Sequence, residues 1–526
     1  MAARLLALAA SAALAAGQTS YSLVSKTSEA IGASTKLPTL TTANDQFGYS
    51  MTQCGTTGQF LLIGTPFHSV GPSAPATCAT KTLCPGVQVA LSVNGAFISG
   101  GIAIPASSAA GFGTDVLCVS TADGGAKAIV GAMGVSVGGV NDEKGSAFIY
   151  SISSTGVLSS PPVSLSTSHV SQLNGDNFGS SVALDNSGSY AMACSPKASS
   201  STGACYIYSG SSFGTQTLVG NPGSLTYSFL GGNDGSIDLI TPASSALVAV
   251  MGAPDTSASA AGSVVFAFFA LNAGGVVGAQ STTLQFFGGG NPFYPAVPFI
   301  NPLSPPAGFT TVPSTTVTGA QWVCDNASPK NCYNMAAAAG DSYGTMITAS
   351  QDGSLVFVGA SGYLLPANTF VGYVDVYRIT PGATPPVSLV QTLYPPNAPG
   401  TSAEAKLGFG TGIAVSADNK RLVIGAGAGT TAPGRVYTFA LASNGKYNLE
   451  STIASPNAAG GDGFGYCVGI AADKSSITVS APMDSGGAGA VYKYSLPAVA
   501  SAAEPPAALA VIAAGLAAAA VAAALN

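Results

Sequence analysis

A short unit recurs along this chain, and its spacing restricts the fold more than any other feature of the sequence. Each copy opens with an aromatic residue and glycine, and seven openings can be aligned: Phe47-Gly48, Phe112-Gly113, Phe178-Gly179, a degenerate Phe229-Leu230-Gly231, Tyr343-Gly344, Phe409-Gly410 and Phe464-Gly465. Successive copies lie roughly 50 to 65 residues apart, except for one interval about twice as long. Repeats of this size are typical of the four-stranded blades of a β-propeller.

Two further elements follow the opening pair in the same order. The first is an apolar strand that ends in small residues, seen as "LLIGTP", "AIVGAM", "YAMACSP", "VAVMGAP", "VFVGAS", "LVIGAG" and "ITVSAP". The second is a glycine followed by an alternating aromatic strand, seen as "GSAFIYS", "GACYIYS", "GSVVFAF", "GYVDVYRI", "GRVYTFAL" and "GAVYKYSL". The first copy has the weaker "GVQVALSV" in that place. Such alternation predicts short strands with one face toward a core.

A single blade cannot bury both faces of its sheet, so we expect the aromatic residues of the opening pair and of the third strand to lie between neighbouring blades. Glycine permits close approach of two backbones near the axis. The seventh copy ends after its third strand at Tyr494, whereas "SYSLVSKT" near the N-terminus reads as a strand without a blade. We expect this strand to complete the seventh blade and close the ring.

The long interval between two copies predicts an insertion. It runs roughly from Leu271 to Met335 and is dense in Pro, Phe and Gly, as in "FFGGGNPFYPAVPFINPLSPPAGF". We expect it to leave the fourth blade as a long surface loop.

The three elements, in this order, resemble the FG-GAP repeats of the integrin alpha-chain propeller and of related secreted proteins. The resemblance covers about residues 20–495, and its best copies are "FGSSVALDNSGSYAMACSP" and "FGYCVGIAADKSSITVSAPMDSGGAGAVYKY". It implies an all-β fold, a seven-bladed β-propeller of four-stranded antiparallel blades, whose loops bind another macromolecule. It implies no catalytic chemistry.

The two ends of the chain predict export and membrane attachment. Residues 1–17 have the basic start, apolar run and small-residue exit of a secretory signal helix, with cleavage expected between Ala15 and Gln18. After the propeller (18–495) and a linker (496–506), residues 507–525 form an apolar C-terminal helix with only Asn526 beyond it. This layout predicts a GPI-attachment signal with Ser501 as the attachment point. A single membrane span and a soluble tail are the alternatives, because the spacer is short and the segment is rich in weakly partitioning Ala.

The composition limits the classes of partner that we expect for this protein. Of 526 residues only 7% are charged, and the formal net charge of -6 is spread without a basic stripe, so nucleic acid is not an expected partner. A surface made mostly of small polar residues suits a protein at the extracellular face of the plasma membrane, or a secreted one. We therefore expect the partners to be the membrane, through the C-terminal segment, and a protein or glycan ligand, through the propeller loops.

Metal binding has weak support. Many FG-GAP repeats carry a calcium loop of the type D-x-D-x-D-G-x-x-D, which supplies several oxygen ligands. The corresponding loops here, "DNSGS", "QDGS", "ADNKR", "ADKSS" and "ADGGA", have one or two possible ligands each and read as tight turns. The partial match "GGNDGSID" makes Asn233, Asp234 and Asp238 a weak metal candidate. We expect no cofactor and no tight calcium binding.

Catalytic patterns are weaker still. The two histidines, His68 and His169, have no partner at metal-ligand or triad spacing, and no nucleophile elbow occurs. The turns resemble the Asp boxes of sialidase propellers, but no arginine cluster or acidic pair accompanies them. We expect a binding or adhesion module that is not an enzyme. A secreted structural or coat component without a discrete ligand is the main alternative, and an extracellular hydrolase is a weaker one.

The nine cysteines fit an oxidising compartment. Three pairs are close in sequence and predict disulfides: Cys78 with Cys84, Cys194 with Cys205, and Cys324 with Cys332. Cys54, Cys118 and Cys467 remain, either with one of them unpaired or all as small buried strand residues. The N-glycosylation acceptor is Asn326 in "NAS".

Overall fold

The computed structural model describes residues 22–28 and, with gaps, 46–495. The longer gaps are 67–85, 104–110, 135–144, 166–175, 220–236, 255–261, 288–308, 314–320, 326–331, 335–341 and 397–407. The predicted signal (1–17), linker and C-terminal segment (507–525) lie outside the described residues. Within the described part of the chain, no helix is both long enough and apolar enough to cross a membrane.

Six blades are each built from one stretch of chain as a four-stranded antiparallel sheet, in which the four strands are hydrogen-bonded in chain order. Blade 1 contains β2 (Met51–Cys54), β3 (Phe60–Thr65), β4 (Gly86–Val93) and β5 (Ala96–Ala103), and blade 2 contains β6 (Phe112–Ser120), β7 (Ala126–Ala132), β8 (Ser146–Ile152) and β9 (Val163–Leu165). Blade 3 contains β10 (Ser181–Leu184), β11 (Ala191–Ser195), β12 (Ala204–Ser209) and β13 (Thr215–Val219), and blade 4 contains β14 (Ile237–Ala243), β15 (Ala246–Ala253), β16 (Ser263–Leu271) and β17 (Val277–Phe287). Blade 5 contains β21 (Tyr343–Ala349), β22 (Leu355–Ala360), β25 (Tyr373–Ile379) and β26 (Val387–Leu393), and blade 6 contains β27 (Gly412–Val415), β28 (Arg421–Ala426), β29 (Arg435–Leu441) and β30 (Tyr447–Ala454). Counted by continuous segments, the described chain thus has six blades and not the predicted seven.

One further four-stranded sheet combines the two ends of the propeller. It contains β31 (Val468–Ile470), β32 (Ser476–Ala481) and β33 (Ala490–Ser495), with β1 (Ser22–Ser28) as its outer strand. Strands β1 and β33 are antiparallel, and Leu23 lies opposite Tyr494. The predicted pairing of the N-terminal strand with the strand that ends near Tyr494 is therefore confirmed. We call this sheet the composite sheet.

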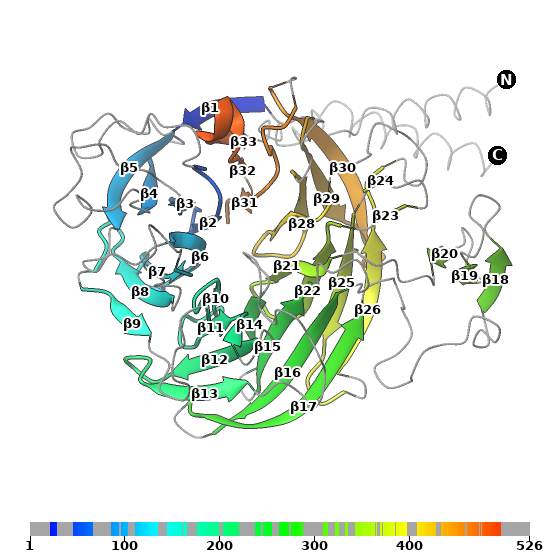
Figure 1. Ribbon diagram of the computed structural model, residues 1–526, viewed down its shortest axis with the longest axis horizontal. Coiled ribbons are helices and arrows are strands. Elements are labelled where there is room, and N and C mark those ends of the chain that lie inside the picture. Colours follow the sequence, from blue (N-terminus) through cyan, green and yellow to red (C-terminus); the bar gives the residue numbers. More distant parts are fainter. Residues whose placement is uncertain are drawn as a thin grey trace, which may run out of the picture.

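The hydrophobic core is a series of layers between neighbouring sheets, which surround a common axis (Figure 1). Between blades 2 and 3, for example, Phe178 packs with Tyr206 of its own blade and with Ile129 and Ile149 of the preceding one. The layer between the composite sheet and blade 1 joins Val491 to Phe47 and neighbouring residues. The expectation that these aromatic residues lie between blades is confirmed, and we call each such layer a seam.

The three repeated glycines of the motif meet at the seams. A Cβ added to Gly131 of blade 2 would overlap the carbonyl oxygen of Gly179 in blade 3, and a Cβ on Gly145 would overlap the backbone of Phe178. Gly179 itself has φ of 83°, which L side chains rarely adopt. The same contact closes the ring, because Gly489 of the composite sheet pairs with Phe47 of blade 1. The repeat therefore encodes backbone contact between blades.

The antiparallel topology divides the connections between two faces of the propeller. The turns between first and second strands, such as 55–59, 121–125 and 416–420, lie on one face with those between third and fourth strands. The longer connections leave from the other face. They include 66–85, 133–145 and the segment 288–342 that joins blade 4 to blade 5.

The predicted insertion needs a correction. Its first part, expected to leave the sheet at Leu271, includes β17, which pairs along β16 as the outer strand of blade 4. Farther on, β18 (Phe309–Pro313), β19 (Gln321–Asp325) and β20 (Cys332–Asn334) form a separate antiparallel sheet, which Figure 1 draws outside the ring. The sequence does not separate the two parts, because the apolar alternation of β17 runs directly into the Pro-rich segment after it.

We call the face from which the longer connections leave the long-loop face. Two small elements occur within connections on this face. Strands β23 (Leu364–Leu365) and β24 (Thr369–Phe370) pair between β22 and β25. The short helical turn α3 (Asp484–Gly487) lies between β32 and β33.

Substitution of a seam glycine tests this account of the motif. We expect Gly131→Ala to lower the free energy of unfolding by about 2 kcal/mol or more, because the new methyl group has no room beside Gly179. Gly214→Ala is the matched control, since Gly214 is exposed and its Cβ would meet only the Ser212 side chain at 3.5 Å. Chemical denaturation of both variants measures the difference, and equal stabilities would contradict the seam assignment.

Candidate functional site

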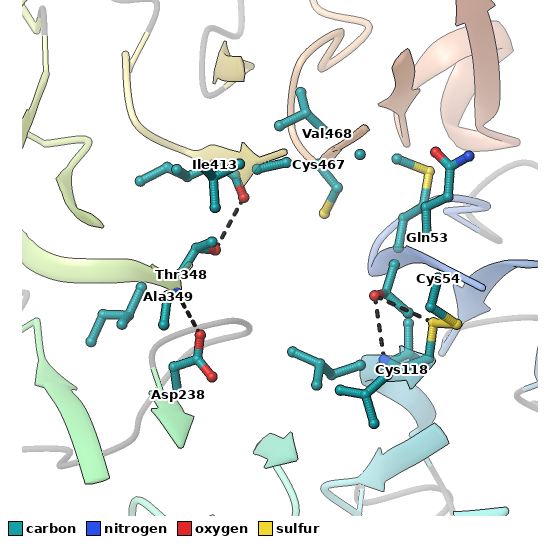
Figure 2. Close-up of a pocket in the computed structure, with 18 of the residues that line it drawn as sticks. Gln53, Cys54, Cys118, Asp238, Thr348, Ala349, Ile413, Cys467 and Val468 are labelled. Atoms are coloured by element: carbon teal, nitrogen blue, oxygen red, sulfur yellow. Dashed lines mark hydrogen bonds between the residues drawn. A yellow bond between two sulfur atoms is a disulfide. The ribbon is translucent and has the colours of Figure 1, made fainter. Parts of the chain in front are cut away.

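A cavity with a volume of about 510 Å³ lies on the axis of the described structure. Its wall comes from the first strands of the sheets, β2, β6, β10, β14, β21, β27 and β31, together with adjoining residues. Figure 2 shows Gln53, Thr348, Ile413 and Val468 around this space. The cavity follows from the architecture, because the innermost strands converge on the axis without filling it.

Two buried carboxyl groups belong to this wall. Asp238 on β14 accepts hydrogen bonds from the N–H groups of Leu239 (2.7 Å) and of Ala349 (2.6 Å), so it joins blade 4 to blade 5. Asp115 on β6 accepts one from the N–H group of Val182 (2.8 Å) and joins blade 2 to blade 3. Burial, reinforced by the charge of Asp115 and opposed by the two N–H donors, raises the pKa of Asp238 to about 7.

Hydroxyl groups near the axis make the same kind of link. Ser50 donates to the carbonyl oxygen of Gly113 (2.8 Å) and Thr348 to that of Ile413 (3.1 Å), each across one seam. Figure 2 marks the bonds of Thr348 and Asp238. These polar groups are thus engaged in joining the blades, and the arrangement supports assembly of the ring more directly than acid–base chemistry.

Three cysteines lie at the axis. Cys54 at the end of β2 and Cys118 on β6 form a disulfide between blades 1 and 2, with their Cα atoms 5.8 Å apart. Cys467 is a thiol on the cavity wall and donates to the carbonyl oxygen of Tyr49 (3.3 Å). The sequence alone leaves the pairing of these three cysteines open. A usable signal existed, because Cys54 and Cys118 follow the opening glycine of adjacent repeats at nearly the same distance.

The predicted short-range disulfides have different outcomes. Cys194 and Cys205 are directly opposite in β11 and β12 and form a disulfide, which confirms that pair. Cys324 lies opposite Cys332 in the register of β19 and β20. Cys78 and Cys84 lie outside the described residues.

The acidic loops that the structure describes in full are hairpin turns. Asp352 accepts hydrogen bonds from Ser350 (2.6 Å), from the N–H group of Ser354 (3.0 Å) and from Asn419 of the next blade (2.9 Å). Burial opposes ionisation, but these bonds prevail and lower the pKa of Asp352 to about 2. In the same way Asp418 binds Ser416 (2.8 Å) within its turn and Lys474 (2.6 Å) of the composite sheet. The turns of successive blades therefore hold one another.

The remaining predicted positions are mostly not described. Asn233, Asp234, Asn326, Ser501, His68 and His169 lie outside the described residues. Asp238 is described, and both of its carboxylate oxygens accept backbone N–H groups. Among the side chains that the structure describes, no three from His, Cys, Asp and Glu form a group that could hold a metal ion.

Comparisons with known proteins add little to the geometry. No protein-family model and no curated protein sequence matches the chain. Hydrazine synthase of Kuenenia stuttgartiensis aligns over 85% of this chain and 95% of its own, with 11% identity and a TM-score of 0.42. A proposed 6-phosphogluconolactonase of Bacteroides uniformis aligns over 65% of this chain and 85% of its own, with 14% identity and a TM-score of 0.30. A eukaryotic initiation factor aligns over 81% of this chain and 80% of its own, with 11% identity and a TM-score of 0.30. The β-propeller assignment rests on the strand pairing of this chain.

The disulfide between blades 1 and 2 allows a quantitative prediction. It closes a loop with a sequence separation of 64, whereas the Cys194–Cys205 disulfide has a separation of 11. Loop-closure entropy predicts a loss of about 4 kcal/mol for Cys54→Ser with Cys118→Ser, and about 3 kcal/mol for Cys194→Ser with Cys205→Ser. Denaturant titration of the two double variants measures this order, and the reverse order would contradict it.

Proposed function

We propose that this chain is an extracellular recognition module of the FG-GAP type, which binds a protein or glycan ligand through its long-loop face. The β-propeller fold and the two disulfides among the described residues indicate an extracellular module. We propose no catalytic reaction for the chain.

The proposal rests on a difference between the connections on the two faces of the propeller. On one face, short turns contact the turns of neighbouring blades, as Asn419 does with Asp352 and Lys474 with Asp418. On the other face, the connections 66–85, 133–145 and 288–342 differ widely in length. Connections that vary on a rigid scaffold are the usual place for binding residues. The face of short turns, in contrast, serves to hold the ring.

A structural or coat role is the second candidate. It is favoured by the cavity wall, where Asp238, Asp115, Ser50 and Thr348 are all engaged in holding blades together. Such a component needs no discrete ligand, so saturable binding separates it from the leading proposal.

Loop replacement tests recognition. Cells displaying the full chain are probed with a panel of fluorescent glycans and soluble cell-surface proteins. We expect saturable binding of at least one probe, and a loss of tenfold or more in affinity when residues 135–144 or 288–308 are replaced by Gly and Ser of equal length. Replacement of the turn 153–157 on the opposite face is the control and should leave binding unchanged. No saturable binding across the panel would favour the structural role.

We further propose that the C-terminal segment is a GPI-attachment signal with Ser501 as the attachment point. Phosphatidylinositol-specific phospholipase C should then release the protein from intact cells, because residues after Ser501 are exchanged for a lipid. Addition of two Lys after Asn526 should impair this processing. Resistance to the enzyme, with the 507–525 segment still detected by mass spectrometry, would establish a membrane span instead.

A further inference from the structure

The seam between blades 4 and 5 differs from the others in its chemistry. In four other sheets the opening aromatic residue contacts an aromatic ring on the third strand, three residues after its glycine. These pairs are Phe112–Phe148, Phe178–Tyr206, Phe409–Tyr437 and Phe464–Tyr492. In blade 5 the opening residue is Tyr343 and the equivalent third-strand position holds Asp375. A carboxyl group thus replaces an aromatic ring in this layer.

Asp375 is only 3% exposed, and three hydroxyl groups surround it. Thr392 donates to its Oδ1 (2.6 Å), and Tyr343 donates to its Oδ2 (3.0 Å), which also lies 3.5 Å from the Tyr377 hydroxyl. The surrounding titratable groups are Tyr343, Tyr373 and Tyr377, and burial raises the pKa values of Tyr343 and Tyr377 well above the ordinary range. Burial also raises the pKa of Asp375 to about 6, although its hydroxyl partners act in the opposite direction.

Blade 4 covers this network with apolar side chains, among them Val264 and Phe266. The centroids of the Phe266 and Tyr377 rings lie 5.6 Å apart. Nearer the axis, the same seam contains Asp238, which reaches from β14 to the N–H group of Ala349 on β21 and is faced by Asp115. Two buried carboxyl groups therefore belong to one seam.

This seam also has the longest chain connection. Residues 288–342 join blade 4 to blade 5, whereas 166–180 join blade 2 to blade 3 and 394–411 join blade 5 to blade 6. The seam between blades 1 and 2, in contrast, is held by the Cys54–Cys118 disulfide.

We propose that the seam between blades 4 and 5 is a proton-dependent closure, tight when Asp238 and Asp375 are protonated and easier to open when they are ionised. The sign follows from linkage. Both carboxyl groups bind protons more strongly in the closed seam than in water, so closure is fully favoured at low pH and weakens as the pH rises through about 6 and 7. The proposal is independent of the ligand.

Thiol labelling of equivalent seam positions tests it. Ala360 is fully buried between blades 4 and 5, and Ala426 holds the equivalent position between blades 5 and 6. Ala360→Cys and Ala426→Cys variants of the full chain are treated with a pyridyl disulfide reagent between pH 5 and pH 8, and mass spectrometry locates the label. The ratio of the two labelling rates cancels the intrinsic reactivity of the thiol.

We expect the ratio, Ala360→Cys over Ala426→Cys, to rise at least about tenfold from pH 5 to pH 8. Asp375→Asn and Asp238→Asn should each make this rise smaller. Thr392→Val keeps the carboxyl group but removes a donor, so it should move the rise to higher pH; this variant serves if an Asn variant does not fold. A ratio that does not change with pH, or that neither Asn substitution nor Thr392→Val alters, would overturn the proposal.

Discussion

Close contact between the backbones of neighbouring blades is the constraint on which the rest of this structure depends. At Gly131 and Gly179 two backbone segments approach so closely that no side chain fits between them. Each contact brings the opening aromatic residue of one blade against the preceding blade, so the hydrophobic layers form between blades. A blade in isolation would expose both faces, and its stability therefore comes from its neighbours.

The same constraint explains why polar side chains on the axis form hydrogen bonds between neighbouring blades. The innermost strands lie side by side without a continuous hydrogen-bonded ladder between them, and their buried N–H and C=O groups need other partners. Asp115, Asp238, Ser50 and Thr348 supply such partners across the seams. Where a carboxyl group does this in a buried place, closure of the ring becomes sensitive to protons.

Much of the fold could be predicted because the constraint is local and repeated. The aromatic-glycine pair, the small-residue strand and the alternating third strand identified the blades, and the unpaired strand near the N-terminus indicated the composite sheet. Some contacts between repeats are harder to predict. Cys54 and Cys118 occupy nearly equivalent positions in adjacent repeats, but this equivalence appears only once the repeats are aligned as neighbouring blades. Asp238 follows a metal-loop pattern in the sequence although it lies on β14. The burial of Asp375 is not evident from the sequence, because the rest of its strand fits the aromatic pattern of the repeat.

Closure of the ring through the composite sheet is the central claim, and a cross-link between the two ends of the propeller tests it most directly. Ser22 lies opposite Ser495, and Ser28 lies opposite Ala490, at the two ends of the β1–β33 pairing. Ser22→Cys with Ser495→Cys should form a disulfide that mass spectrometry detects between the two peptides. Ser22→Cys with Ala490→Cys should not, because these positions lie at opposite ends of the strand pair. Equal cross-linking of both pairs, or of neither, would contradict the closed ring described here.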